Sequence, residues 1–402
     1  MMAAMRALFA STANAGHFRP MLPVIRACVA AGWEVAVATP ASYATEVQSF
    51  GLVSKPFADV PPALMGAVFS RLPSLAPGEA DLVVIQELFG RLDPQAALPG
   101  LAATIADWRP DLVVREQVEF GSAAAACAAG VPQAQVAIGM AQLGGAFFGV
   151  LREPLAELAD YAGVTRTALL EEVAGSPTIT SVPVSLNATE FVPTTGFDPV
   201  EVELGPVWRF APEAAGLGGE LPAAWGDPGL PLVYVSFGSV IARLPISAGL
   251  YDRVLAALAA EPIRVLLTLG VPLEDAGLRD VIPANTRVES WWPQAAVMGA
   301  AGAMVGHGGF GTTMAALEAG VPQVVAPLFT SDQRVNAEQI NASGAGIAVT
   351  GGLQAIDRVV EPLRRILTEP TFRQRAAELA AEMRAQPALA ELPPMLEDLL
   401  AR

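Results

Sequence analysis

The amino-acid sequence predicts an α/β protein built from two doubly wound, Rossmann-like domains that face each other across a cleft. Two stretches, starting near residues 7 and 231, each follow the order strand, loop, helix and strand, which opens a parallel sheet covered by helices. Residues 212–230 between them are rich in Gly, Pro and Ala without periodicity, as in a linker. We therefore predict an N-terminal domain (1–211), the linker (212–230), a C-terminal domain (231–385) and a tail (386–402) that packs back on the N-terminal domain.

The N-terminal domain begins with a short apolar strand, Ala7–Ala10, and a loop of small residues. A helix over Arg19–Ala31 follows, because its apolar residues recur at helical spacing and Pro20 lies in the first turn, where proline is tolerated. Apolar runs and an Ala-rich stretch then continue the alternation. They predict strands at Glu34–Thr39, Leu112–Val114 and Ala134–Ala137 and a helix at Ser122–Ala129.

The C-terminal domain repeats this order. It begins with a strand at Leu232–Ser236, a tight turn at Phe237–Ser239 and a helix at Gly249–Ala260. Further strands are predicted at Ile263–Leu269, Ala303–Val305 and Gln323–Ala326, and helices at Thr312–Ala319, Val335–Ala342, Gln354–Leu367 and Thr371–Ala385. Two such domains place a crevice between the carboxyl ends of their strands, where open α/β sheets bind their ligands.

Composition and charge exclude several classes of function. Of the 402 residues, 52% are hydrophobic and 16% charged, which is typical of a globular protein. The formal net charge of −16 disfavours nucleic acid and anionic membrane surfaces as partners. The only cysteines, Cys28 and Cys127, predict buried thiols in a reducing compartment, and Cys and His are too few for a structural zinc site. We find no signal peptide or membrane span and expect a cytoplasmic protein.

Both histidines lie at the carboxyl end of a predicted strand. His17 is either a helix-capping, partly buried residue or a general base, since an imidazole titrates near neutral pH. A base works better with a carboxylate on its second ring nitrogen. Asp111 and Glu116 flank one strand, and Glu116 is the better partner because it lies at the carboxyl end, on the same side of the sheet as His17. Glu119 is the nearest competitor for that role.

The second histidine lies in Gly306-His307-Gly308-Gly309-Phe310-Gly311-Thr312-Thr313, where a strand ends and a helix begins. Free N–H groups and a positive helix end form a cradle for a diphosphate. Gly306, Gly308 and Gly311 also satisfy the dinucleotide fingerprint, with Asp332 lying 21 residues beyond Gly311, and alone this fits an NAD enzyme. Against that interpretation, the motif does not follow the first strand of its domain, and Phe237-Gly238-Ser239 is a second turn of the same type.

Two further motifs lie in the C-terminal domain. Trp291-Trp292-Pro293-Gln294 offers either a face on which a nucleobase stacks, or one core and one surface tryptophan. Asp332-Gln333, predicted in a loop, can make several hydrogen bonds to sugar hydroxyls. The sequence has no Asp-x-Asp pair, so a metal-bridged diphosphate is not indicated, and no Gly-x-Ser-x-Gly elbow of a serine hydrolase.

Taken in order, these motifs resemble the GT-B class of glycosyltransferases, and especially the bacterial family that glycosylates natural products such as polyketides, macrolides and enediynes. The resemblance covers nearly the whole chain. It is strongest in the ordered run Trp291-Trp292-Pro293-Gln294, His307–Thr312, Glu318–Gln323 and Asp332-Gln333. Residues 110–117 are similar to the deoxysugar-transferring subset, although many relatives have Asp where Glu116 stands, and Trp292 is larger than the usual residue.

The resemblance implies a role for each matching residue. The C-terminal domain would bind the donor, with Trp291 flanking the base, Gln294 binding the nucleoside and Glu318 taking ribose hydroxyls. The diphosphate would be held by Ser239, His307, Gly308, Gly309, Gly311 and Thr312. Asp332 and Gln333 would bind the donor sugar. In the N-terminal, acceptor-binding domain His17 would be the catalytic base, oriented by Glu116.

We therefore expect an inverting, metal-independent glycosyltransferase that moves a sugar from a TDP- or UDP-sugar to a hydroxyl of a hydrophobic natural-product aglycone. TDP and a deoxysugar are favoured, no cofactor or stable membrane insertion is expected, and a homodimer is left open. Met65, Phe69, Phe147 and Phe148 either wall an apolar acceptor pocket or belong to ordinary core helices. The alternatives are a sugar-nucleotide epimerase or hydrolase on the same scaffold, and a non-catalytic nucleotide-sugar-binding partner.

Overall fold

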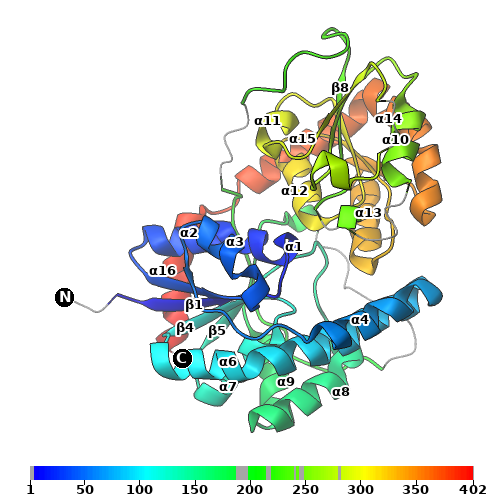
Figure 1. The fold of residues 1–402 in the computed structure, drawn as a ribbon. Coiled ribbons are helices and arrows are strands. Elements are labelled where there is room, and N and C mark those ends of the chain that lie inside the picture. The colour runs from blue at the N-terminus through cyan, green and yellow to red at the C-terminus, as the bar shows by residue number, and fades with distance from the viewer. Residues whose placement is uncertain are drawn as a thin grey trace.

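The structure, a computed structural model, describes residues 4–186, 198–213, 219–239, 241–243, 249–278 and 282–401. Figure 1 shows two α/β lobes, one from each half of the chain, with the last, red segment of the chain returning to the N-terminal lobe. Residues 214–218 of the predicted linker lie outside the described residues.

The N-terminal lobe contains a seven-stranded parallel sheet in the order β3-β2-β1-β4-β5-β6-β7. Its strands are β1 (Arg6–Ala10), β2 (Glu34–Ala38), β3 (Val53–Ser54), β4 (Leu112–Glu116), β5 (Gln133–Val136), β6 (Thr178–Thr180) and β7 (Val207–Arg209). The helices are α1 (Ala15–Phe18), η1 (Arg19–Met21), α2 (Leu22–Ala30), η2 (Ala41–Tyr43), α3 (Ala44–Ser49), α4 (Pro62–Arg71), η3 (Leu72–Ser74), α5 (Pro77–Val83), η4 (Val84–Leu92), α6 (Asp93–Trp108), α7 (Phe120–Ala129), α8 (Gly145–Ala162), α9 (Arg166–Gly175) and η5 (Val184–Leu186).

The C-terminal lobe contains a six-stranded parallel sheet in the order β10-β9-β8-β11-β12-β13. Its strands are β8 (Leu232–Ser236), β9 (Arg264–Thr268), β10 (Thr286–Glu289), β11 (Ala303–Gly306), β12 (Gln323–Val325) and β13 (Gly346–Ala348). The helices are η6 (Ile241–Arg243), α10 (Leu250–Leu258), η8 (Leu273–Asp275), α11 (Gln294–Met298), α12 (Phe310–Glu318), α13 (Ser331–Ser343), η9 (Gly352–Arg358), α14 (Val360–Thr368) and α15 (Pro370–Arg384). The predicted fold class, two doubly wound parallel-sheet domains, is confirmed.

Each sheet is buried on both faces. Along β1, Leu8 and Ala10 belong to one core cluster, whereas Ala7 and Phe9 belong to the cluster on the opposite face. This explains why the strands are continuous apolar runs rather than alternating ones. Both strand orders reverse beside the first strand of the domain, between β1 and β4 and between β8 and β11. Such reversal points are where parallel sheets leave a crevice for ligands.

The C-terminal segment joins the N-terminal core. It forms η10 (Leu389–Glu391), α16 (Leu392–Glu397) and η11 (Asp398–Ala401), and α16 lies near α2 (Figure 1). Leu392 and Leu396 are fully buried in the same cluster as Phe9 and Ile25. Burial of two leucines supplies several kcal/mol, about 1.5–3 per side chain, that holds this segment to the first lobe.

Three sequence expectations need correction. The helix expected over 19–31 is divided, because α1 ends at Phe18 and α2 begins only at Leu22, after a 3₁₀ turn that contains Pro20. The helix expected over 354–367 is likewise a 3₁₀ segment followed by α14. Asp332 and Gln333 lie in the first turn of α13 rather than in a loop. Within the described residues, no helix is both long and apolar enough to cross a membrane.

Candidate active site

His17 lies just beyond the carboxyl end of β1, in the one-turn helix α1. Asn14 precedes that turn with φ 97° and ψ 157°, a strained conformation that non-glycine residues rarely adopt, and its side chain accepts a hydrogen bond from Gly16 N. This sharp turn brings the imidazole back over the sheet edge, beside the end of β4.

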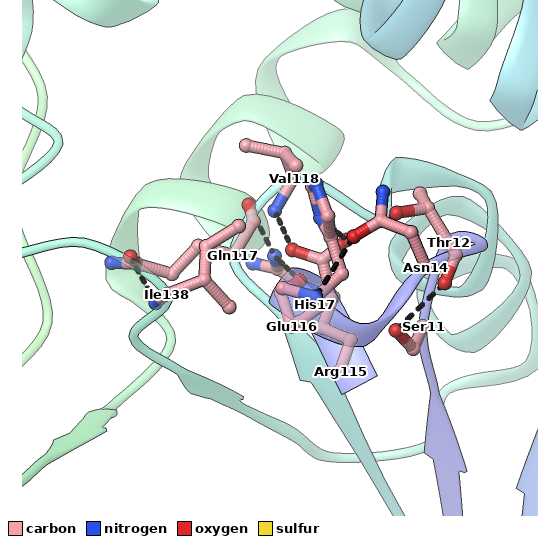
Figure 2. A network of polar contacts seen from close by, with 10 residues as sticks. Ser11, Thr12, Asn14, His17, Arg115, Glu116, Gln117, Val118 and Ile138 are labelled. Carbon is pink, nitrogen blue, oxygen red and sulfur yellow. Dashed lines mark hydrogen bonds and ion pairs between the residues drawn. The ribbon is translucent and has the colours of Figure 1, made fainter. Parts of the chain in front are cut away.

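Glu116, the last residue of β4, receives that imidazole. His17 Nδ1 lies 3.0 Å from Glu116 Oε1, and the carboxylate also accepts hydrogen bonds from Val118 N at 2.8 Å and Thr12 Oγ1 at 3.1 Å (Figure 2). The side chain is fully buried. Burial opposes its ionisation, but the His17 charge and the three donors outweigh that effect and lower the pKa of Glu116. The site therefore holds a buried carboxylate, not a neutral acid.

The carboxylate in turn sets the state of His17. A carboxylate only accepts, so the hydrogen bond places a proton on Nδ1 and leaves Nε2 free to take one from a substrate. Burial lowers the pKa of His17, but the charge and hydrogen bond of Glu116, with smaller effects from Asp93 and Asp332, raise it overall. This arrangement is that of a general base held in one tautomer.

The competing carboxylates are engaged elsewhere. Glu119 caps the N-terminus of α7, where its oxygens accept from Ser122 N at 3.2 and 2.9 Å. Asp111 lies at the opposite end of β4 and accepts from Arg6 N at 2.8 Å. The topological choice of Glu116 as the partner of His17 thus agrees with the geometry.

The glycine run forms the matching turn in the C-terminal lobe. His307 follows β11, Gly308 has φ 89°, and α12 begins at Phe310. A Cβ at Gly309 would lie 2.5 Å from His307 Nε2, and one at Gly308 would lie 2.7 Å from Gln333 O. Both glycines are therefore required by packing, and they leave the first turn of α12 open for an anion.

The turn after β8 closes the other side of this cradle. Gly238, with φ 73°, packs so closely on His307 that an added Cβ would lie 3.2 Å from the ring. Ser239 follows in the same turn. Burial lowers the pKa of His307 to about 4, and its Nδ1 is buried without a hydrogen-bond partner among the described residues. The ring is therefore neutral, and a neutral imidazole can donate one hydrogen bond to a phosphate oxygen.

Gln294 belongs to the cradle, but Glu318 does not. Gln294 Nε2 lies 3.3 Å from Thr312 Oγ1 and 3.4 Å from the hydroxyl of Tyr234, which ties the start of α11 to the first turn of α12. Glu318 is the last residue of α12, about 12 Å along the helix axis from its start. Burial raises the pKa of Glu318 to about 7. Its expected contact is with the ribose hydroxyls and not with the diphosphate, and that contact stays a prediction.

The two tryptophans divide between surface and core. Trp291 is 62% exposed, so its indole offers an open face. Trp292 is half-buried against an apolar cluster and donates from Nε1 to the carbonyl of Glu220 at 3.0 Å. Only Trp291 is placed for stacking on a base.

Asp332 and Gln333 lie opposite His17. Asp332 is exposed, and it is close enough to act on the pKa of His17 across the cleft. Gln333 is buried, and its Oε1 accepts hydrogen bonds from Leu328 N at 2.9 Å and Phe329 N at 3.4 Å. The side-chain oxygen of Gln333 is therefore occupied by its own loop, which leaves the amide nitrogen as the group for a ligand.

The expected acceptor wall is half wrong. Phe147 and Phe148 are each 2% exposed and belong to the core under α6 and α7, so neither lines an open pocket. On α4, Met65 is half-buried and Phe69 is 43% exposed, and both remain candidates. Sequence reasoning missed Phe89, whose ring centroid lies 5.4 Å from that of His17. It lies in η4, a π-helical turn whose register no simple apolar period predicts.

Within the described residues, no three His, Cys, Asp or Glu side chains are grouped to hold a metal ion.

Comparisons with known proteins decide the family. The model "Erythromycin biosynthesis protein CIII-like" matches with its N-terminal domain over residues 26–209 and its C-terminal domain over 252–399. The chain belongs to this family. It is a natural-product glycosyltransferase with the GT-B fold, as the sequence resemblance predicts.

Similar proteins span the full length of this glycosyltransferase. L-demethylnoviosyl transferase from Streptomyces niveus is 32% identical, with 95% of each chain covered. TDP-daunosamine transferase DnrS from Streptomyces peucetius is 30% identical, covering 99% of this chain and 97% of the relative. Among solved structures, glycosyltransferase SnogD from Streptomyces nogalater matches with a TM-score of 0.73 at 27% identity, covering 99% and 100%. Glycosyltransferase VinC in complex with dTDP shares the fold, with a TM-score of 0.74 at 22% identity and the same coverage.

Proposed function

We propose that this glycosyltransferase moves a deoxysugar from TDP to a hydroxyl of a hydrophobic aglycone, with inversion at the anomeric carbon and without a metal ion. The observation that carries the proposal is the His17–Glu116 pair at the reversal point of one sheet, opposite the diphosphate cradle at the reversal point of the other. The name of one relative includes a TDP-sugar, and a solved neighbour binds dTDP, which favours TDP over UDP.

In the proposed reaction, Nε2 of His17 accepts the proton of the acceptor hydroxyl as its oxygen attacks the anomeric carbon. The bond from that carbon to the diphosphate oxygen breaks on the opposite face, and its electron pair leaves with TDP. Glu116 stabilises the imidazolium that forms, through a charge-assisted hydrogen bond. Attack from the face opposite the leaving group gives a product of inverted configuration.

The leaving diphosphate would be stabilised by protein groups. The N-terminal turn of α12 offers free N–H groups and the positive end of the helix, and the neutral His307 ring beside it can add one N–H donor. Ser239 and Thr312 lie in the two facing turns. These groups replace the charge that a divalent cation would supply, so transfer should persist in excess EDTA. Trp291 would stack on thymine, and the Gln333 amide and Asp332 would bind the sugar.

The test is transfer by the purified protein from TDP- and UDP-sugars to a panel of apolar alcohols, followed by mass spectrometry. Replacement His17→Ala should lower kcat by about 10²- to 10⁴-fold, the usual contribution of a general base, and leave TDP affinity unchanged. Near wild-type turnover by that variant would refute the role of His17. Release of free or epimerised sugar without consumption of an alcohol would instead favour the hydrolase or epimerase alternative.

A further inference from the structure

One helix of the C-terminal lobe, α13, contacts both the donor cradle and the N-terminal lobe. Figure 1 places it on the side of its lobe that faces the other lobe. Its first turn contains Asp332 and Gln333. Two hydrogen-bonded contacts from N-terminal residues reach this helix, and neither follows from the motifs that define the donor site.

The first contact is made by Asp81 of α5. Its Oδ1 accepts a hydrogen bond from Ser331 N at 3.1 Å, and its Oδ2 lies 2.5 Å from Arg334 Nη2. Ser331 N is one of the donors at the start of α13 that lack a partner within the helix, and the side chain of Thr330, in the capping position, accepts no hydrogen bond from the helix backbone. Asp81 therefore caps α13 from the other lobe, where a negative charge also favours the helix dipole.

The second contact passes through Asn336, one turn further along α13. Its Nδ2 donates to the carbonyl of Gly308, in the diphosphate cradle, at 2.7 Å. Its Oδ1 accepts from Met140 N, in the N-terminal lobe, at 3.3 Å. Asn336 is 1% exposed and Asp81 is 7% exposed, so both polar groups are removed from water and depend on these partners.

We propose that Asp81 is a positioning residue that, when the lobes close, fixes the first turn of α13 so that Asp332 and Gln333 hold the donor sugar against His17. This inference rests on the proposed function. Ser331, which Asp81 holds, is the direct neighbour of Asp332 along the chain. Separation of the lobes breaks both Asp81 contacts, so the sugar-binding turn keeps its cap only in the closed arrangement, with the acceptor side in place.

The proposal predicts which binding step depends on Asp81. The diphosphate cradle consists of C-terminal residues that Asp81 does not touch, so Asp81→Ala should leave TDP affinity within about threefold of wild type. The efficiency of sugar transfer, kcat/KM, should fall about 10- to 100-fold, as expected for loss of charge-assisted hydrogen bonds. Asp81→Asn keeps an acceptor for Ser331 N but removes the charge opposite Arg334. Its kcat/KM should therefore lie between those of Asp81→Ala and wild type.

A matched control is Glu87→Ala. Glu87 of η4 forms an exposed ion pair with Arg71 of α4, near α5 in the sequence of the N-terminal lobe. Its removal should change neither transfer nor TDP affinity. Hydrogen exchange gives a second readout that needs no acceptor. With TDP-sugar bound, the peptide over residues 329–335 should be protected in wild type and Glu87→Ala but exchange faster in Asp81→Ala.

Equal losses of TDP affinity and of transfer in Asp81→Ala would overturn the proposal, because they would show a general defect. The proposal would also be overturned if Asp81→Ala is folded, as judged by its thermal melting curve, and shows the same sugar transfer or the same hydrogen exchange as wild type. If Asp81→Ala does not fold, the same measurements on Asp81→Asn and Arg334→Met test the proposal. A wild-type protein that transfers no sugar would refute the proposed function, and the exchange comparison would still test the contact of Asp81 with α13.

Discussion

Replacement of Glu116 by Gln keeps the size of the side chain and one oxygen for His17 but removes the negative charge, and that change separates orientation from electrostatics. The carboxylate lies 3.0 Å from Nδ1 and is fully buried, so water cannot replace its charge. A charge-assisted hydrogen bond contributes about 1.5–3 kcal/mol. Glu116→Gln should therefore lower the plateau of kcat by about 10- to 100-fold, because the imidazolium formed during proton transfer is no longer stabilised.

The same charge fixes the pH dependence. Glu116 raises the pKa of His17, and a general base must be unprotonated, so wild-type activity rises with pH through that raised pKa. Loss of the charge should move the rising limb to lower pH, by about 1–2 pH units at 1.36 kcal/mol per unit. Burial raises the pKa of Asp93 to about 7, so Asp93 ionises over the same range, and Asp93→Asn gives the comparison profile with Glu116 intact.

The assay is kcat/KM for transfer from pH 5 to 9 for the three proteins, together with TDP affinity by titration calorimetry. TDP affinity should stay at the wild-type value, since Glu116 lies in the other lobe from the cradle. A rising limb that stays in place or moves to higher pH in Glu116→Gln would refute the pairing as the source of the His17 pKa.

Two further predictions concern the donor cradle and the acceptor side. Gly309→Ala puts a Cβ 2.5 Å from His307 Nε2, so TDP affinity should fall at least about tenfold in titration calorimetry. Gly66→Ala, where an added Cβ has nothing within 4 Å, should not change TDP affinity. Equal affinities in the two variants would contradict the proposed cradle. Phe89→Ala removes the ring beside His17 and should raise the KM for an apolar acceptor severalfold, while the KM for the donor stays constant. A change in the donor KM alone would contradict the placement of Phe89 on the acceptor side.

The sequence predicts the strands and the contact of His17 with Glu116 well because both follow from topology. Strand Leu232–Ser236 agrees at both ends with β8, since a run buried on both faces has a clear apolar signal. Glu116 could be chosen over Asp111, at the other end of the same strand, because the carboxyl ends of neighbouring parallel strands share one edge, whereas Glu119 is set aside only by its cap contact with α7. No contact information was needed for either.

The remaining site depends on tertiary contacts that leave no local signal. Phe147 and Phe148 look the same in sequence whether α8 covers a core or lines a pocket, and only packing shows that they are buried. Asp81 is one acid among 40 acidic residues, and its partner lies 250 positions away. Thr330 is a residue type that favours a helix start, but its side chain does not cap α13; Asp81 of the other domain caps the helix, and the sequence cannot show that contact.

The central step of the proposed reaction is removal of the acceptor proton by His17 while the sugar leaves its diphosphate. The most direct measurement is the anomeric configuration and yield of the product, by NMR and mass spectrometry, from one TDP-deoxysugar of known configuration with wild type and His17→Ala. We expect a product of inverted configuration from wild type and a yield at least about a hundredfold lower from His17→Ala, with TDP still bound. Retained configuration, or equal yields from the two proteins, would contradict it.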